Sequence, residues 1–202
     1  MKNLNKNYTF SLIALTSILL LISRGFLLAE NDKKDTKDFD EHATLMTGEA
    51  KDYFVKGNNY LRNGQYQSAI ETFEKLLQIN PNDTKVYDNL GSAYYSIGQT
   101  QKAINSYQKS IQIDSGSAIP YQGLGLVYAE IGQYQEALNY FQKAVEIDNN
   151  FALAYQGAGC AYYSLNKYRE AKENLNMAKD LFNSKGDYKS AAGIDSFLKN
   201  IP

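Results

Sequence analysis

The sequence repeats itself between Ala50 and Lys185 at a spacing of 34 residues, the distance from Tyr53 to Tyr87. Aligned at that period, the chain gives four units with no insertion between them: 50–83, 84–117, 118–151 and 152–185. Four columns keep one residue type in every unit: Tyr53, Tyr87, Tyr121 and Tyr155; Gly57, Gly91, Gly125 and Gly159; Tyr60, Tyr94, Tyr128 and Tyr162; Ala69, Ala103, Ala137 and Ala171. A fixed period of about 34 residues is typical of an array of stacked helix pairs.

The columns follow the period of an α-helix within each unit. Tyr53, Gly57 and Tyr60 are spaced i, i+4 and i+7, and Ala69, Phe73 and Leu76 repeat that spacing. A glycine between the two runs supplies the positive φ that ends a helix. The pattern therefore predicts helices over 48–62 and 67–79, 84–97 and 100–113, 117–131 and 134–147, and 151–165 and 168–184.

The glycine column indicates close packing between helices. Glycine inside a helix costs about 1 kcal/mol relative to alanine. Keeping it at one position in four units predicts that a Cβ there would collide with a packed neighbour. The alanine column has the same interpretation, since a small side chain lets two helices approach. A single unit cannot cover both of its faces, so each unit depends on the next.

The period and the order of large, glycine, tyrosine, alanine and aromatic columns resemble the tetratricopeptide repeat (TPR). Tyr replaces the Trp that often opens that motif, Pro81 is present in the first unit only, and Asn166 replaces the turn glycine in the fourth. The resemblance covers about two thirds of the chain. It implies an all-α, right-handed α-solenoid of four helix-turn-helix repeats that binds a peptide or a partner protein. Residues 186–202 are expected to form a C-terminal capping helix, because apolar residues recur between Tyr188 and Lys199.

Residues 1–29 predict either a cleaved signal peptide or an uncleaved membrane anchor. Lys2 and Lys6 precede a mostly apolar, uncharged run, and Leu27-Leu28-Ala29 offers a cleavage point. The anchor alternative, residues 8–28, stays open because the uncharged run is at the short limit for a spanning helix. In either case the basic start keeps the N-terminus inside. The repeats are therefore expected to be exported, either periplasmic or anchored in the inner membrane.

Residues 30–46 predict a charged, disordered linker. Glu30 to His42 holds six acids and three lysines, with Phe39 as its only large apolar residue. The whole chain has a net charge of −1, and cleavage after Ala29 would remove three basic residues and no acid. That balance argues against a nucleic-acid partner, which would require a basic face.

The first helix of each unit is expected to line the inner surface of the array. Its non-core positions, counted from the start of each unit, are the second, fifth, ninth and twelfth. The predicted partner-binding residues on this surface are Phe54, Asn58, Lys85, Asp88, Asn89, Ser92, Tyr95, Gln122, Leu126, Gln156, Cys160 and Tyr163.

The character of these residues predicts a peptide ligand with little net charge. Some relatives clamp a terminal carboxylate with Lys and Arg, and here Asn58 and Asn89 match the amide members of that set. Phe54, Ile119 and Gly123 stand where the cations would be. Amide groups can instead bind a peptide backbone through both donors and acceptors. The alternative is that these residues are unselected surface or pack between units.

No residue set predicts catalysis or a metal site. Cys160 is the single cysteine, and the only histidine, His42, lies in the linker. No His, Cys or acidic cluster has metal-ligand spacing, so neither a metal nor a cofactor is expected. The favoured function is a non-enzymatic scaffold that holds a partner protein. The alternatives are self-association within an envelope or secretion assembly, and a substrate carrier for an enzyme.

Overall fold

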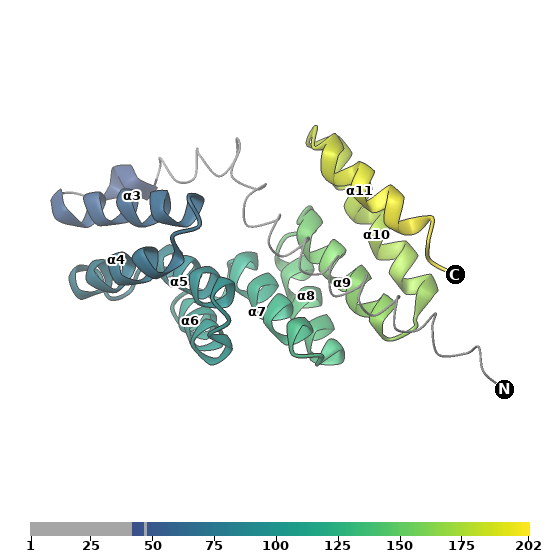
Figure 1. Ribbon diagram of the computed structural model, residues 1–202, viewed down its shortest axis with the longest axis horizontal. Helices are drawn as coiled ribbons and strands as arrows, with labels where there is room; N and C mark the ends of the chain where they lie inside the picture. Colours follow the sequence, from purple (N-terminus) through teal and green to yellow (C-terminus); the bar gives the residue numbers. More distant parts are fainter. Residues whose placement is uncertain (1–41, 47) are drawn as a thin grey trace.

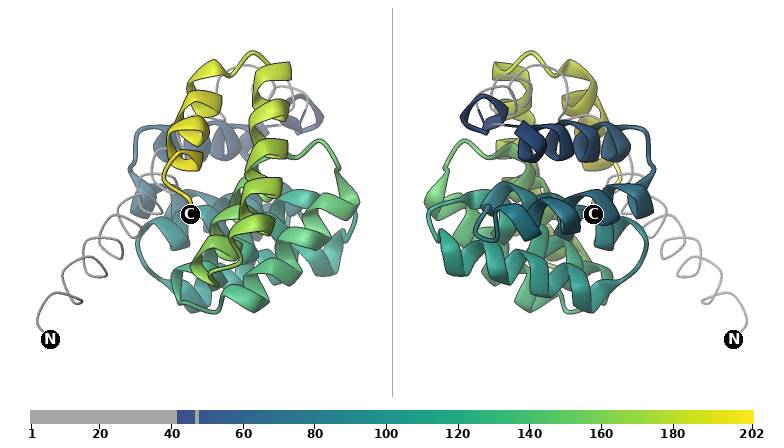
Figure 2. Two further views of the ribbon diagram at one scale, coloured as in Figure 1. Left: turned by 90° about the vertical axis from the view of Figure 1, so that its right-hand side faces the viewer. Right: turned by 90° about the vertical axis from the view of Figure 1, so that its left-hand side faces the viewer.

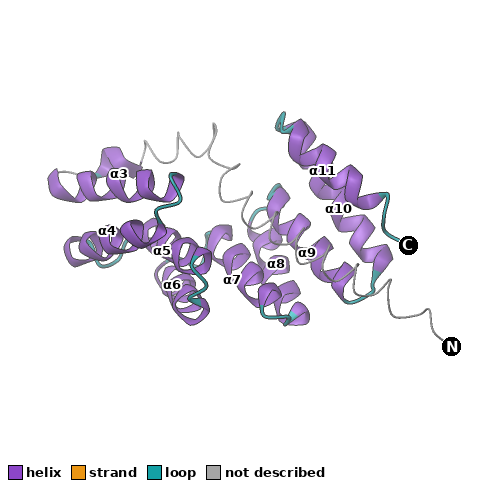
Figure 3. Cartoon of the chain, in the orientation of Figure 1, coloured by secondary structure: helices purple, strands orange, loops and turns teal. Residues whose placement is uncertain are grey.

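The computed structural model describes residues 42–46 and 48–202, and these residues are helical with no strand (Figure 3). The predictions for residues 1–29 and 30–41 lie outside them. Each predicted helix of the repeats is present, with bounds within one residue of the prediction. In chain order the helices are α3 (Gly48–Arg62), α4 (Tyr66–Ile79), α5 (Thr84–Ser96), α6 (Thr100–Ile113), α7 (Ala118–Glu130), α8 (Tyr134–Ile147), α9 (Ala152–Ser164), α10 (Tyr168–Ser184) and α11 (Tyr188–Leu198).

The helix pairs follow one another in chain order from α3 to α11 (Figures 1 and 2). Within a unit the two helices pack together, and each second helix packs on the first helix of the next unit. The first helices α3, α5, α7 and α9 also pack on one another along the array. This places them on the inner surface of the solenoid, as predicted.

The turn inside each unit has the same geometry four times. Gly64, Gly98 and Gly132 have φ values of 69°, 75° and 78°, and Asn166, the substitute in the fourth unit, has a φ of 59°. In the first unit the amide of Gly64 donates to the Leu61 carbonyl. Asparagine is one of the few other residues that tolerate this region. The predicted equivalence of the glycine and asparagine turns is therefore confirmed.

The glycine column faces a bulky residue of the second helix, as predicted. A Cβ built on Gly57 would lie 2.5 Å from the Phe73 ring, and one on Gly125 would lie 2.5 Å from the Phe141 ring. The same holds in the second and fourth units, where the nearest atoms belong to Tyr107 and Leu175. All four second-helix residues are buried. In all four units, therefore, the absence of a Cβ on the glycine leaves space for the bulky residue of the second helix. We call this space a socket.

In two of the sockets, a glycine of the following unit faces the same ring from the other side. A Cβ on Gly123 would lie 2.4 Å from Tyr107, and one on Gly157 would lie 2.5 Å from Phe141. Each of these rings is thus held between glycines of two successive units. In the second unit this position is Asn89, so the first junction of the array differs from the later ones.

The outer flank of the first unit ends the array with polar residues. Val86, Leu90 and Ala93 of α5 are buried where α5 packs on the first unit. The corresponding residues of α3 are Asp52, Lys56 and Asn59, and all three are exposed. Solenoid ends require such a polar face, because no neighbouring unit covers them.

Helix α11 covers the last unit at the other end. Ala191 and Ile194 of α11 are buried in the same cluster as Leu175 and Phe182 of α10. The turn before α11 has the geometry of the turns inside the units, since Gly186 has a φ of 78°. The predicted capping helix is therefore present.

Residues 42–46 differ from the predicted linker. Residues 42–45 form a helical turn, and Ala43 is buried in the cluster that contains Phe54. The His42 ring meets the Phe54 ring edge-on at 4.9 Å, and His42 Nε2 lies 3.0 Å from Asp83 Oδ2. Asp83 is also the N-cap of α5, accepting from the Val86 amide. These contacts order a segment whose composition alone predicts disorder.

Candidate functional site

The predicted inner-surface residues divide into two groups. Four are buried, and the others are half-buried, which is the state expected of groups that can meet a ligand. The buried group is Phe54, Asp88, Gln156 and Cys160; the half-buried group is Asn58, Lys85, Asn89, Ser92, Tyr95, Gln122, Leu126 and Tyr163. These residues form a row along the inner surface, and the row is therefore accessible to a ligand only at some positions.

The N-terminal end of the row is filled by the chain itself. Phe54 is covered by His42, and Asn58 is used in contacts within the protein. Asn58 Nδ2 donates to the Phe54 carbonyl at 2.8 Å, and its Oδ1 accepts from Asn89 Nδ2 at 3.2 Å. The amide pair predicted to bind a peptide thus joins the first two units, which leaves Asn89 Oδ1 as its remaining acceptor.

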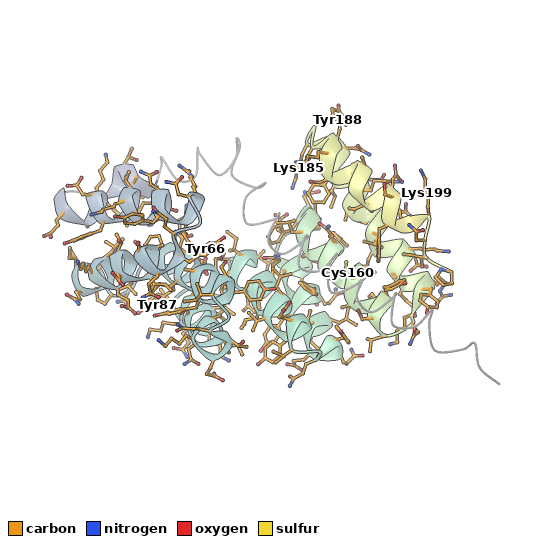
Figure 4. The ribbon with its side chains drawn as sticks, in the orientation of Figure 1. Tyr66, Tyr87, Cys160, Lys185, Tyr188 and Lys199 are labelled. Carbon is orange, nitrogen blue, oxygen red and sulfur yellow. The ribbon has the colours of Figure 1, made fainter. Side chains whose placement is uncertain are left out.

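The C-terminal end of the row is part of the core. Cys160 and Leu153 belong to the same buried cluster as Ala191 and Ile194 of α11. Burial raises the pKa of the Cys160 thiol to about 12, so the thiolate needed for nucleophilic chemistry does not form at neutral pH. Figure 4 shows Cys160 on its helix within the array. The prediction that it would line an open groove is wrong.

Tyr163 also contacts the end of the array. Its ring lies 5.2 Å from Phe197 of α11 and 5.5 Å from Tyr168 of α10. One part of this residue therefore packs against the cap, and only the remainder can meet a ligand.

The middle of the row, on α5 and α7, is partly accessible, and two of its groups also make contacts within the chain. Asn89, Ser92, Gln122 and Leu126 are half-buried there. Ile119, at the start of α7, is 50% exposed. We call these five residues the central surface. Its mixture of amide, hydroxyl and aliphatic groups suits a ligand with both backbone polarity and apolar side chains.

Asp88 lies beneath this surface. It is 7% exposed, and its Oδ1 has no hydrogen-bond partner among the described residues. Burial raises the pKa of Asp88 to about 7, while a hydrogen bond from Ser110 acts in the opposite direction. Gln156, at the same position of the fourth unit, likewise has a buried, unpartnered Oε1. Sequence reasoning placed both residues on the surface and missed their burial.

The part of the chain that the structure describes contains no His, Cys, Asp and Glu grouping that could hold a metal ion. Within the same residues no helix is long and apolar enough to cross a membrane. The candidate site is the central surface, on the inner faces of α5 and α7.

Family models match this chain over most of the array. A TPR repeat model matches residues 57–98 and 91–132, and tetratricopeptide repeat models match residues 118–151 and 152–185. The chain belongs to the tetratricopeptide repeat family. The resemblance drawn from the repeated columns is thereby confirmed for all four units.

Solved structures of TPR proteins share the fold. The crystal structure of MamA is 28% identical, with a TM-score of 0.62 over 78% of this chain and 96% of that chain. The TPR domain of Arabidopsis OM64 is 28% identical, with a TM-score of 0.52 over 57% of this chain and 93% of that chain. The TPR2B domain of yeast Sti1, solved in complex with pHsp70, is 24% identical, with a TM-score of 0.55 over 57% and 93%. No curated protein matches the chain in sequence.

Proposed function

We propose that this TPR array is a non-enzymatic scaffold that holds a segment of a partner protein along its central surface. The observation that carries the proposal is the contrast along the inner row. The ends of the row hold the buried Phe54, Gln156 and Cys160, and Asn58 and Tyr163 there contact other parts of the chain. Asn89, Ser92, Gln122, Leu126 and Ile119 in the middle are half-buried or exposed.

The chemistry of the central surface fits a polypeptide. Gln122 carries a carbonyl acceptor and an amide donor, which is the combination that a peptide backbone requires. Asn89 adds a carbonyl acceptor, since its amide group donates to Asn58. Ile119 and Leu126 offer apolar contact beside them. A relative of the same fold, the yeast Sti1 domain, was solved in complex with a protein ligand, pHsp70. A binding role for this chain follows the same use of the fold.

The proposal has no catalytic step. Cys160 is buried with a raised pKa, and it has no histidine beside it, because the only histidine of the chain, His42, contacts Phe54 and Asp83 at the other end of the array. The scaffold acts by holding its partner.

Selection of peptides from a randomised display library, using residues 42–202 as bait, tests the proposal. A selected peptide should bind the wild-type chain with a measurable Kd. Gln122→Ala and Leu126→Ala should each weaken that binding by roughly fivefold to tenfold, the range of a lost hydrogen bond or of lost apolar contact. Calorimetry gives the Kd values.

Gln135→Ala is the matched control. Gln135 belongs to the same unit as Gln122 but lies exposed on α8, the second helix. It should leave the Kd unchanged, and thermal unfolding confirms that each variant is folded. Equal binding by all four proteins would place the ligand elsewhere and overturn the assignment of the central surface.

The proposal includes export of the array, with residues 1–29 as a cleaved signal or as an anchor. Its support is the sequence pattern of basic start, apolar run and small residue before Glu30. Mass analysis of the protein purified from its native envelope tests this directly. A mature chain that begins near Glu30 supports cleavage, an intact chain in the membrane fraction supports the anchor, and an intact chain in the cytoplasm contradicts both.

A further inference from the structure

The second unit has more buried polar side chains than any other unit. Four of its residues form what we call the polar cluster: Asp88, Ser92, Tyr107 and Ser110. The residues at the same positions of the first unit are Phe54, Asn58, Phe73 and Leu76, and those of the third are Gln122, Leu126, Phe141 and Ala144. Only the second unit has an acidic side chain at these four positions, and only it has a hydroxyl group at each of the other three.

Two hydroxyl groups of the polar cluster contact each other, and the third donates to the backbone. Ser92 Oγ and the Tyr107 hydroxyl lie 3.1 Å apart. Ser110 Oγ donates to the Thr84 carbonyl at 3.4 Å and also stands within reach of the Asp88 carboxyl. Asp88 Oδ1 remains without a partner among the described residues. A buried acceptor left unpaired destabilises the folded state, and more so when it is charged.

The charges around Asp88 do not neutralise it. Asp114 and Asp83 both disfavour its ionised form, and Lys85, the cation on its own helix, has the weakest influence of the neighbours. The Tyr107 hydroxyl carries no charge, because burial raises its pKa. Asp88 is therefore a buried acceptor with two acidic groups and one weakly acting cation near it.

Asp88 lies close to the central surface. Its neighbours on the same face of α5 are Lys85 and Ser92, at i−3 and i+4, and both are half-buried. A long, flexible side chain of the partner would have to pass between these two side chains to reach the unpartnered carboxyl oxygen.

We infer that the second unit holds a subsite for one basic side chain of the bound partner, whose ammonium or guanidinium group donates to Asp88 with the polar cluster around it. This inference rests on the proposed function and refines it, since it assigns a charge to one position of an otherwise neutral ligand. Charge-assisted hydrogen bonds of this kind are about twice as strong as neutral ones. Because the first and third units have Phe54 and Gln122 at this position, the basic residue would also fix the register of the peptide.

The test uses arrays of randomised nine-residue peptides with one fixed central residue. The central residue is lysine or arginine in the charged sets and norleucine or citrulline in the neutral sets. Wild-type residues 42–202 should bind the charged sets about tenfold more tightly than the neutral sets, as expected for one charge-assisted hydrogen bond. Asp88→Asn should bind all four sets equally.

Asp180→Asn is the charge-matched control, because Asp180 is exposed on α10. It should keep the preference of the wild type. Loss of preference in this control as well as in Asp88→Asn would show an effect of overall charge and overturn the subsite. Binding without preference by the wild type would overturn the subsite alone, and absence of binding to every set would overturn the proposed function together with it.

Discussion

The second and third units have the same backbone arrangement and differ in the side chains that fill their interiors. Tyr107 and Phe141 occupy equivalent sockets, each between a glycine of its own unit and a glycine of the next. Beside Tyr107 the second unit has Asp88, Ser92 and Ser110, whereas the third unit has Gln122, Leu126 and Ala144 at the same positions. The comparison separates two kinds of position: the sockets, which fix how units stack, and the positions beside them, which vary without changing the stacking.

This separation matters for how such an array can acquire a function. A Cβ on any of the four column glycines would lie within 2.6 Å of a buried side chain, so substitution there is destabilising, and variation is tolerated better at residues that line or underlie the inner surface. The second unit uses that freedom to bury a carboxyl group, at a cost in stability. The predictions below test whether that cost and the socket geometry are separate properties.

The largest effect is expected at Asp88. Burial raises its pKa from 3.8 to about 7, so the folded state holds the proton over a range in which the unfolded state releases it. The group therefore favours folding at low pH, and this contribution is lost as the pH rises through about 7. Asp88→Asn should be more stable than the wild type by up to about 4 kcal/mol at pH 8, with little difference near pH 4.

Urea denaturation at pH 4, 6 and 8 measures this dependence for both proteins. Asp180→Asn, which removes an exposed carboxyl, should follow the wild-type curve. If the stability of Asp88→Asn and that of the wild type change with pH in parallel, burial of the Asp88 carboxyl does not destabilise the second unit. The contrast with the third unit would then be wrong.

The socket prediction compares two glycines inside helices. A Cβ on Gly125 would lie 2.5 Å from the Phe141 ring, while a Cβ on Gly193 of α11 would meet nothing within 4 Å. Gly125→Ala should destabilise the chain by about 2 to 3 kcal/mol through overpacking. Gly193→Ala should stabilise it by up to about 1 kcal/mol through helix propensity. Thermal unfolding of the pair distinguishes them, and equal shifts would contradict the socket.

A smaller effect is expected when the second unit is made to resemble the third. Tyr107→Phe keeps the ring in its socket and removes the hydroxyl that lies 3.1 Å from Ser92 Oγ. Because one hydrogen bond is lost and Ser92 can rebind water, the stability should fall by about 1 kcal/mol or less. Chemical denaturation provides the value, and a loss as large as that of Gly125→Ala would show that the hydroxyl helps to set the stacking.

The smallest effect is expected at the turn of the fourth unit. Asn166 has a φ of 59° where the other units have glycine. Asn166→Gly should change the stability by only about 0.5 kcal/mol, because asparagine already tolerates this region. Asn166→Val should cost more than 1 kcal/mol, since a β-branched residue does not. Similar melting temperatures for these two variants would contradict the assigned turn geometry.

The repeated features could be predicted from the sequence because four copies report the same physical constraint. The glycine column predicted that a Cβ at this position would collide with a packed neighbour. The repeat period and the turn residues predicted the bounds of the helices. A feature that occurs in only one unit could not be predicted in this way. Helical spacing predicts which face of α5 carries Asp88. How deeply Asp88 is buried depends on Ser110 and Tyr107, which lie on α6. The order of residues 42–45 likewise depends on His42 meeting Asp83, a contact between residues far apart in the chain.

The central claim is that a partner lies along the inner faces of α5 and α7. Site-specific photo-crosslinking of a display-selected peptide tests it most directly, with a photo-reactive amino acid at Leu126 in one protein and at Lys109, exposed on α6, in another. The account predicts that the peptide crosslinks from position 126 and not from position 109. Crosslinking from position 109 alone, or equally from both, would contradict it.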